Sequence, residues 1–326
     1  MKALQLSSSP HIRSGESVPR VMWTVFLALG PALLWSFVIF GLAAVKLTVI
    51  CVLTAMLAEA LSLKIKGVSP KPALDGSAAL TGLLVAFNVP PSIPLWMPML
   101  GTVVGVVIVK QCFGGLGCNF MNPALIGRAF LLASFPKHMT LWTIGTQFGG
   151  GNVDAVTQAT PLGLLKNGGE EALLEAFGDK TTLYLDLFFG CGRGAIGCVG
   201  EISAALLLLG GIFLIFRGII SWHIPFSFLG ALAALTFLLG GDPLFAVLSG
   251  GAMLGAFFMA TDMVTSPLTH KGQLVFGLGC GVLACLIRRF GGYPEGVSYA
   301  ILIMNATVPL IDSAFRNKVF GKGKKK

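Results

Sequence analysis

Long uninterrupted apolar runs are the feature that most restricts how this chain can fold. Residues 21–45 contain no charged side chain, and roughly 20 consecutive apolar residues suffice to cross the hydrocarbon core of a bilayer. Of all 326 residues, 55% are hydrophobic and 11% are charged, whereas about a quarter are charged in soluble domains. The chain is therefore predicted to be an all-α polytopic membrane protein. The polar stretch SSSPHIRSGES and the length of the first run argue against a cleaved signal peptide.

The apolar runs predict about ten transmembrane helices, five on each side of a polar interval. The two five-helix halves then have opposite orientations, as in an inverted-topology repeat. A Gly-Gly pair followed by Met-Asn occurs in both halves, within 114–122 and 291–305, with unequal spacing. The predicted divisions are a cytoplasmic segment (1–20), a first transmembrane half (21–135), a loop (136–182), a second half (183–313) and a basic tail (314–326). The runs are 21–45, 47–63, 73–89, 93–109, 119–135, 196–216, 222–239, 244–260, 273–287 and 297–311.

Gly, Pro and charged residues interrupt the chain at or near membrane depth. They occur at 75–76, 88–94, 114–117, 191–194 and 242–243. Irregular backbone at this depth is tolerated only where it is buried in protein or lines a wet cavity. We therefore expect broken or re-entrant helices around a central site.

The distribution of the net charge of +9 favours a membrane surface and argues against nucleic acid as a partner. Excess Lys and Arg mark cytoplasmic loops, and a basic tail is typical of an anionic cytoplasmic surface. Most cationic residues fall on the side of the two termini, so both termini are predicted to be cytoplasmic and the 136–182 loop extracytoplasmic. The other side receives only Lys46, Lys137, Lys166, Lys180, Arg288 and Arg289.

The polar interval contains GNVDAVTQATPLG at 151–163, which has the features of an attachment site. Pro161 moves Thr160 out of the helical region into an extended conformation, so its hydroxyl is predicted to be accessible. Ala159 and other small neighbours leave room for a bulky group. Asp154 and Thr157 supply polar anchors or, alternatively, a local turn held by an Asx bond.

The segment DAVTQAT at 154–160 resembles the Asp-x-x-Thr-x-Ala-Thr motif on which a flavin transferase places FMN, as a phosphodiester to the final threonine. Nearly the whole chain resembles the RnfD component of the Rnf electron-transport complex. That family is similar to the NqrB component of the Na⁺-translocating NADH:quinone oxidoreductase. The other matching blocks are SSSPHIRSG, DGSAALTGLLVAFNVPP, KQCFGGLGCNFMNPALIGRAFLL, TDMVTSPLT and GGYPEGVSYAILIMNATVPLID.

The resemblance implies a membrane flavoprotein with FMN covalently bound through Thr160, within an attachment motif that includes Asp154, Thr157 and Ala159. It also implies a urea-channel-like fold in a bacterial inner membrane. Electrons would pass between reduced ferredoxin and NAD⁺ through partner subunits. This chain would contribute one flavin relay and part of a route for Na⁺ or H⁺, with no catalytic residue and no independent activity.

The resemblance also implies specific partners and a further cofactor. The partners are the iron–sulfur subunits, a second subunit with covalent FMN and, during maturation, the extracytoplasmic flavin transferase. The related quinone-reducing pump suggests a second, non-covalent riboflavin, for which the sequence shows no motif.

Ionisable residues within or beside the apolar runs are candidates for an ion path, because charges at the bilayer centre usually face a bundle interior or a water-filled route. Glu59, Asp75, Glu201 and Asp262 are the residues we select. The alternative is structural: an internal ion pair with Arg128 or Arg193, or a helix N-cap made by Asp75 or Asp242. The remaining member of the set is Asp186.

Two polar motifs are candidate flavin or ion neighbours. Asn122 and Arg128 in FMNPALIGRAF read as a helix entrance followed by a cation, which can hold an anion or a flavin edge. The alternative is packing around a re-entrant segment. In TDMVTSP, Thr261, Asp262 and Thr265 offer oxygen ligands for Na⁺ or hydrogen bonds to a flavin; alternatively, they satisfy a broken helix.

The seven cysteines contain no Cys-x-x-Cys pair and are predicted to be buried small apolar side chains. A contribution of Cys112 and Cys118 to a cluster is the alternative. No metal site, Walker A loop or Rossmann fingerprint is visible. The same architecture would also suit a small-solute channel or secondary transporter, because fold does not decide function.

Overall fold

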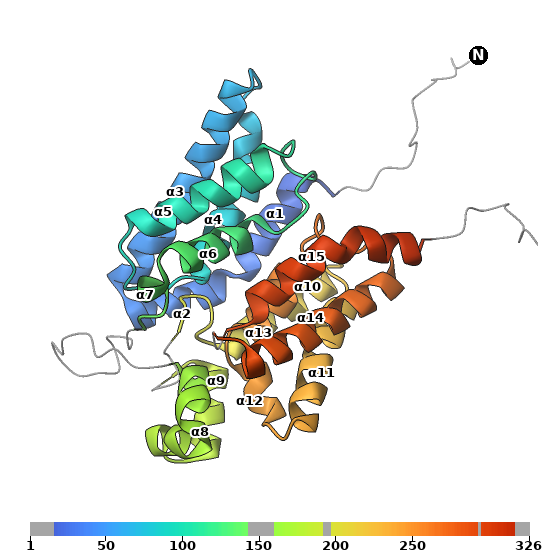
Figure 1. Cartoon of the computed structure of the whole chain (residues 1–326). Helices are drawn as coiled ribbons and strands as arrows, with labels where there is room; N and C mark the ends of the chain where they lie inside the picture. Colours follow the sequence, from blue (N-terminus) through green and yellow to red (C-terminus); the bar gives the residue numbers. More distant parts are fainter. Residues whose placement is uncertain (1–15, 143–159, 192–196, 293–294, 317–326) are drawn as a thin grey trace, which may run out of the picture.

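The computed structural model describes residues 16–142, 160–191, 197–292 and 295–316. Within these ranges every regular element is a helix and no strand occurs, which confirms the all-α prediction. The helices of the two halves form two groups that lie side by side (Figure 1). The groups contact each other where α1 and α2 pack against α10, and where α6 packs against α15.

The first half consists of long outer helices and shorter inner ones. Its elements are α1 (Val18–Ala28), α2 (Gly30–Phe40), α3 (Leu42–Ile65), the short η1 (Lys71–Leu74), α4 (Ser77–Phe87), α5 (Trp96–Val103), the π-helical η2 (Val104–Gln111), α6 (Pro123–Ser134) and α7 (Pro136–Met139).

Helix α3 shows how the sequence separates a lipid-facing surface from a buried one. Large apolar side chains at every fourth position are exposed, as expected for one face of a helix in contact with lipid. The opposite face is buried and includes the only carboxylate of the helix, Glu59. The exposed residues are Val49, Leu53, Leu57 and Leu61, and the buried ones include Leu47, Cys51 and Ala55.

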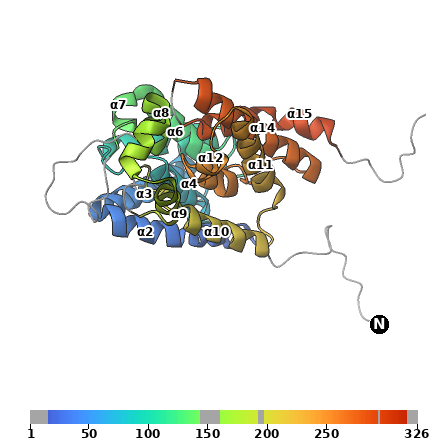
Figure 2. The same ribbon diagram turned by 90° about the horizontal axis from the view of Figure 1, so that it is seen from below.

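The second half begins with two helices beside the bundle and continues into a more broken set. Figure 2 shows α2 and α10 along one edge of the molecule. The elements are α8 (Pro161–Phe177), α9 (Lys180–Phe189), α10 (Ala204–Phe216), α11 (His223–Leu238), α12 (Pro243–Leu248), α13 (Ala252–Leu254), the π-helical η4 (Gly255–Met259), α14 (His270–Phe290) and α15 (Val297–Ala314).

Helices α11 and α14 approach each other closely because two glycines, four residues apart, face α11. A Cβ added at Gly277 would lie 2.0 Å from Ser227 Oγ, and one added at Gly281 would lie 2.4 Å from the carbonyl oxygen of Phe228. Small residues at this spacing let membrane helices pack backbone to backbone. Larger residues at either position would force the two helices apart.

Four helical stretches are long and apolar enough to cross a membrane. They are Val18–Phe40, Leu42–Ile65, His270–Phe290 and Val297–Ala314. Shorter apolar helices occupy the other predicted runs, except that 244–260 is divided into α12, α13 and η4. The predicted end of the first run at 45 is wrong, because Gly41, with φ of 59°, ends α2 and α3 begins immediately after it.

The predicted chain breaks are confirmed where the structure describes them. Residues 75–76 separate η1 from α4, 88–94 separate α4 from α5, 114–117 follow η2, and 242–243 precede α12. Of the fifth break, 192–194 lie outside the described residues. The interval 136–182, predicted as a loop, contains α7 and α8. Its polar composition hid an amphipathic pair, since Leu173 and Phe177 of α8 pack against Leu183 and Leu187 of α9.

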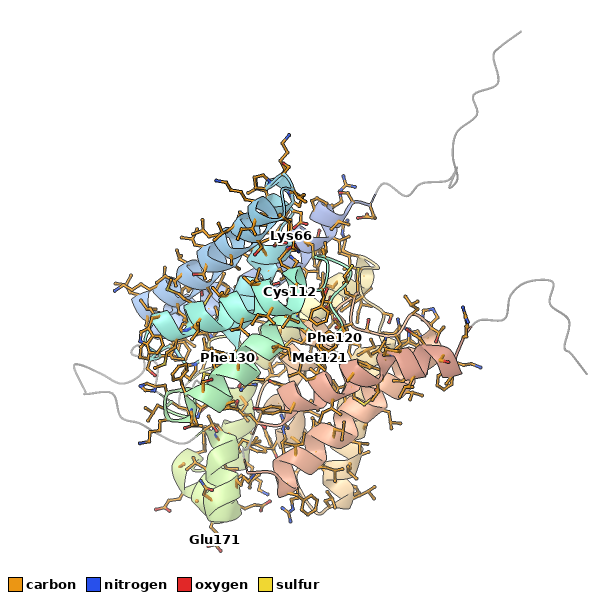
Figure 3. All side chains as sticks on the ribbon, turned by 45° about the horizontal axis from the view of Figure 1, so that its top comes forward. Lys66, Cys112, Phe120, Met121, Phe130 and Glu171 are labelled. Atoms are coloured by element: carbon orange, nitrogen blue, oxygen red, sulfur yellow. The ribbon has the colours of Figure 1, made fainter. Side chains whose placement is uncertain are left out.

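The prediction of buried cysteines holds for four of them and is wrong for Cys112 and Cys118, which are exposed, while Cys191 is half-buried. Both exposed cysteines belong to the glycine-rich bend after η2, where the backbone turns at Gly114 with φ of 121°. Cys112 and Phe120 lie on the surface of this bend (Figure 3). The buried set is Cys51, Cys198, Cys280 and Cys285.

Candidate functional site

Thr160 is the N-cap residue of α8. Its backbone is extended, with φ of −58° and ψ of 155°, as Pro161 predicts. Its Oγ1 accepts a hydrogen bond from the N–H of Gly163 at 3.1 Å, and the residue is 6% exposed. The prediction of an accessible hydroxyl is therefore wrong, because an extended residue at a helix start turns its hydroxyl back onto the first turn. Asp154, Thr157 and Ala159 lie outside the described residues.

The position of the Thr160 oxygen suits a phosphate ester. Helix N-termini present unpaired N–H groups and a partial positive charge, so they favour anions such as phosphate. A phosphodiester on Oγ1 would lie at this end of α8. The chemistry of the donor groups therefore fits the phosphate of FMN.

A small cavity of about 20 Å³ lies beside Thr160, which is enough for one water molecule. Its walls come from separate parts of the chain and include Leu162, Glu201, Ser249 and Glu295. Ser249 is 3% exposed, and its Oγ has no hydrogen-bond partner in the described part of the chain. The cavity is thus polar on one side and incompletely satisfied.

A group of buried charged side chains borders this cavity. The guanidinium of Arg128, from α6, forms an ion pair with Glu295 and donates to the hydroxyl of Ser298. The ionisable atoms of Cys198, Glu201 and Glu295 all lie within 4.8 Å of one another. The structure therefore brings Arg128 and Glu201 into the surroundings of Thr160, with Glu295 as the link.

Cys198, Ser249 and Glu295 are residues that sequence reasoning missed at this site. Glu295 belongs to GGYPEG, between two predicted crossings, so it was not counted among the residues at membrane depth. The available signal was a lone carboxylate in a Gly- and Pro-rich turn bounded by apolar helices. Ser249 lies within the broken run 244–260, where its hydroxyl gave no signal.

Arg288 closes the C-terminal end of α12. Its guanidinium donates hydrogen bonds to the carbonyl oxygens of Ala246 at 2.6 Å, Ser249 at 2.9 Å and Gly250 at 3.0 Å. The last carbonyls of a helix have no partner within it, and a cation there satisfies them. Arg288 thereby fixes the turn that forms one wall of the Thr160 cavity.

In the first half, Glu59 belongs to a closed network rather than an open path. Lys110 Nζ lies 2.8 Å from one oxygen of Glu59 and 2.6 Å from Ser77 Oγ, and Gln111 donates to the other Glu59 oxygen at 2.8 Å. Glu59 is 3% and Lys110 2% exposed. The structural alternative of an internal ion pair is thus confirmed for Glu59, with Lys110 as the partner.

Two aspartates act at helix N-termini, as the structural alternative predicted. Asp75 Oδ1 accepts from the N–H of Ser77 at 2.8 Å, at the start of α4. Asp242 Oδ1 accepts from the N–H groups of Leu244 at 3.0 Å and Phe245 at 3.1 Å, at the start of α12. The phenol of Tyr184, on α9, donates to the second oxygen of Asp242, and this bond raises the pKa of Tyr184 to about 12.

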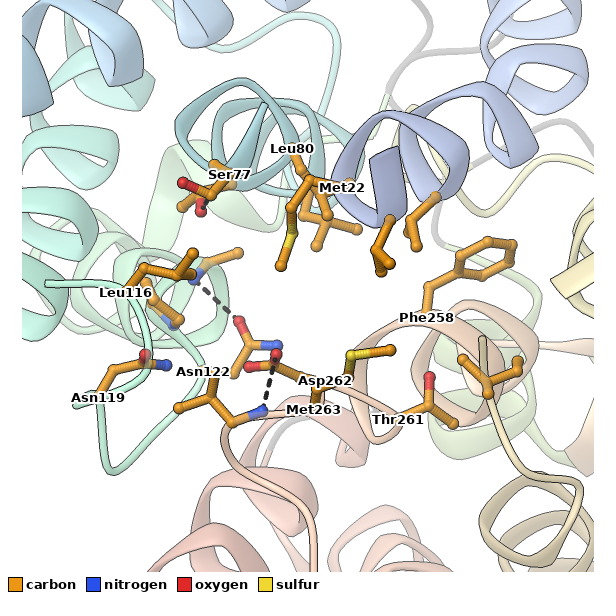
Figure 4. A pocket seen from close by; sticks show the side chains of 18 of the residues that line it. Met22, Ser77, Leu80, Leu116, Asn119, Asn122, Phe258, Thr261, Asp262 and Met263 are labelled. Carbon is orange, nitrogen blue, oxygen red and sulfur yellow. Dashed lines mark hydrogen bonds between the residues drawn. The ribbon is translucent and has the colours of Figure 1, made fainter. Parts of the chain in front are cut away.

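A cavity of about 80 Å³ lies between the two halves, with Asn119 and Asn122 on one side and Thr261 and Asp262 on the other (Figure 4). Asn122 caps α6, accepting from the N–H groups at positions 124 and 125 at 3.0 and 3.4 Å, which confirms the predicted helix entrance. Its amide also donates to the carbonyl of Met259 at 3.3 Å. This bond ties the two halves together.

The side chains of TDMVTSP bond locally, as in a broken helix. Asp262 accepts from the hydroxyl of Thr265 at 3.2 Å and from the N–H of Val264 at 3.4 Å, and Thr261 donates to the carbonyl of Phe257 at 2.6 Å. Asp262 and Lys110 both line the cavity between the halves. The selected carboxylates therefore separate: Glu59, Asp75 and Asp262 group around this cavity, and Glu201 lies with Thr160.

These features define a class: a helical membrane protein whose helices break near the middle and whose charged residues gather in two buried groups, one beside a threonine at a helix N-terminus. The chain belongs to the NQR2, RnfD, RnfE family, whose sequence profile matches residues 5–321.

The relatives are subunits of redox-driven pumps, and each is the D component of its complex. The relative from the Na⁺-translocating ferredoxin:NAD⁺ oxidoreductase complex of Acetobacterium woodii is 48% identical, over 98% of this chain and 95% of its own length. The relative from the proton-translocating ferredoxin:NAD⁺ oxidoreductase complex of Clostridium ljungdahlii is 46% identical, over 97% and 96%. The relative from the ion-translocating oxidoreductase complex of Escherichia coli O127:H6 is 39% identical, over 98% and 99%.

Proposed function

We propose that this chain is the membrane flavoprotein subunit of an ion-translocating ferredoxin:NAD⁺ oxidoreductase complex, with FMN esterified to Thr160. The observation that carries the proposal is the position of Thr160, at the end of DAVTQAT and at the N-terminus of α8. The names of the relatives support the same assignment and favour it over a solute channel. When bound, the flavin supplies an electron carrier that cannot diffuse away between transfers.

The partners that follow from this proposal are the other subunits of the complex. They include the iron–sulfur subunits and the second subunit with covalent FMN, while the flavin transferase acts during maturation. The chain itself contributes the tether, the helix N-terminus around the phosphate and the buried charges near Thr160. A second, non-covalent riboflavin does not fit the cavity beside Asn122, because about 80 Å³ is well below the roughly 300 Å³ of small-molecule sites. We therefore propose the covalent FMN alone.

For ion translocation we propose that the cavity between the halves forms part of the route, with Asp262 and Lys110 on its walls. Both halves place a π-helical segment next to this cavity, η2 before Asn119 and η4 before Thr261, and such segments are frequent at functional sites. One relative translocates Na⁺ and another translocates protons, so either ion is compatible with the family.

We further propose ten crossings of a bacterial inner membrane, in two inverted halves, with cytoplasmic termini and Thr160 on the outer side. The asymmetry of Lys and Arg supports this orientation. Lys66 and Glu171, which the proposal places on opposite sides of the membrane, lie at opposite ends of the molecule (Figure 3).

Attachment of flavin is tested on denatured protein made in cells that contain the transferase. We expect the wild-type band to keep yellow fluorescence on a denaturing gel, and Thr160→Ala to lose it completely. Thr269→Ala is a matched control, because Thr269 caps α14 with a bond of the same length, 3.1 Å from Gly272 N to Oγ1, and should leave the fluorescence unchanged. A wild-type band without flavin would refute the proposal.

The orientation is tested with cysteines introduced at Lys166 and Lys66. Cys112 and Cys118 are exposed and must first be replaced by serine, since they would react with the probe. We expect an impermeant thiol reagent added outside intact cells to label position 166 and not position 66. Labelling of position 66 alone would invert the topology and place Thr160 where the transferase cannot act.

A further inference from the structure

A cavity of about 230 Å³, lined from α8, α11, α12 and α14, has no role in the function proposed so far. It is larger than the cavity beside Thr160 and the one between the halves, at about 20 and 80 Å³. Leu165, Leu239, Phe245 and Cys285 give it apolar walls. Small-molecule sites combine such walls with a few polar groups that fix orientation.

The polar groups of this cavity are mainly cationic. Lys166, Arg288 and Arg289 line it, with Asp242 as the only carboxylate among its described walls. Asp242 caps α12 and accepts from Tyr184, so its oxygens already have partners. Apolar walls with an excess of positive charge suit a flat apolar group that carries negative charge.

The cavity adjoins the site of attachment. Leu162 lines both this cavity and the one beside Thr160. Arg288 lines the larger cavity and donates to the carbonyls of Ser249 and Gly250, which form the wall of the smaller one. One side chain and one turn therefore separate Thr160 from the larger space.

The sizes of the two cavities divide a flavin nucleotide between them. The space beside Thr160 has room for a single water, so it excludes a three-ring system. About 230 Å³ is slightly below the roughly 300 Å³ at which sites for whole drug-sized ligands begin. Such a volume suits a ring system whose phosphate lies elsewhere, at the N-terminus of α8.

We propose that this cavity houses the isoalloxazine ring of the flavin esterified to Thr160. Arg288 and Arg289 then supply positive charge that stabilises the ring when it is reduced and anionic, since charge beside the ring tunes its potential. The inference rests on the proposed function. It adds the location of the ring and the residues that set its potential.

The location is tested by filling the cavity. Thr236→Trp, on α11, projects an indole into the space, and Phe226→Trp on the exposed face of the same helix is the control. We expect both variants to keep covalent flavin on a denaturing gel. In the native protein, the fluorescence anisotropy of the flavin should fall in Thr236→Trp to the value of the denatured protein, and stay at the wild-type value in Phe226→Trp.

The role of the charge is tested by Arg289→Gln, with Arg217→Gln at the end of α10 as the control. Removing a cation beside the ring should move the flavin midpoint potential to more negative values. The expected shift is about 59 mV for each tenfold loss in the relative affinity for the one-electron-reduced ring. Arg217→Gln should keep the wild-type potential.

Three outcomes would overturn the inference. One is attached flavin with wild-type anisotropy in Thr236→Trp. A second is an unchanged potential in Arg289→Gln. The third is a phospholipid that native mass spectrometry finds on Thr160→Ala and that Arg289→Gln releases, which would make the cavity a lipid site. If Thr236→Trp fails to fold, Leu239→Trp at the half-exposed rim replaces it. Absence of flavin from the wild-type band would instead refute the proposed function itself.

Discussion

The two halves of the molecule each bury a group of charged residues, and the two groups are built differently. In the first half, Lys110, Glu59 and Ser77 join in a network with bonds of 2.6 to 2.8 Å. Beside Thr160, by contrast, Ser249 Oγ and Arg128 Nε have no hydrogen-bond partner in the described part of the chain. Across the same ranges, no Lys or Arg nitrogen lies within 4.0 Å of Glu201.

The difference separates a structural group from one that can respond. A closed network loses a bond whenever a new ligand enters, and an unmatched buried charge or donor is costly. The first group therefore holds α3, η2 and the start of α4 together. The group beside Thr160 has a donor and a carboxylate to spare, which is what a site that gains a phosphodiester charge requires.

The largest expected effect comes from opening the first group. Lys110→Met leaves Glu59 buried without its cation and should lower the free energy of unfolding by about 3–5 kcal/mol. Adding Glu59→Met should recover most of this loss, because an apolar pair of similar volume replaces the ion pair. Unfolding in mixed micelles, followed by circular dichroism, measures both. A double variant as unstable as Lys110→Met would show that the charge has another role.

A paired comparison of two buried serines has a smaller expected effect. Ser77→Ala removes the oxygen that Lys110 and the Asp75 carboxylate share, and should cost about 1–3 kcal/mol. Ser249→Ala removes a hydroxyl without a partner, so the unfolding free energy should stay within about 0.5 kcal/mol of the wild type. Equal losses in the two variants, in the same micelle assay, would contradict the distinction between the groups.

The smallest effect is expected for an ion pair on the surface. Lys180 lies 3.5 Å from Glu170, and both side chains are at least half exposed. Lys180→Met should change the free energy of unfolding by less than about 1 kcal/mol, and added salt should reduce even that difference. A salt-independent loss of several kcal/mol would place this pair in a buried interface with a partner subunit.

Much of the fold could be predicted from the sequence, because membrane helices require long apolar runs and breaks require Gly, Pro or Asp at fixed places. Asp75 and Asp242 illustrate this: each comes directly before a Gly or Pro that starts a helix, and each caps it. The family resemblance is likewise confirmed by the match over residues 5–321.

The partners of buried charges could not be predicted in the same way. Glu59 and Lys110 are 51 residues apart, and Arg128 and Glu295 are 167 apart, so only the packing of helices brings them together. The accessible hydroxyl expected at Thr160 failed for a local reason, since the proline that frees the backbone also starts the helix that the hydroxyl caps. Attachment of flavin at Thr160 stays a prediction.

Arg288 gives the second half a mechanical connection between its two cavities. Its guanidinium lines one cavity and holds three carbonyls of the turn that forms the wall of the other. Any anion that draws this guanidinium outward must release those carbonyls, and the turn carrying Ser249 would then relax next to Glu201. A single side chain thus works as a latch, through which events at an outer chamber can loosen an inner one without any helix having to move as a whole.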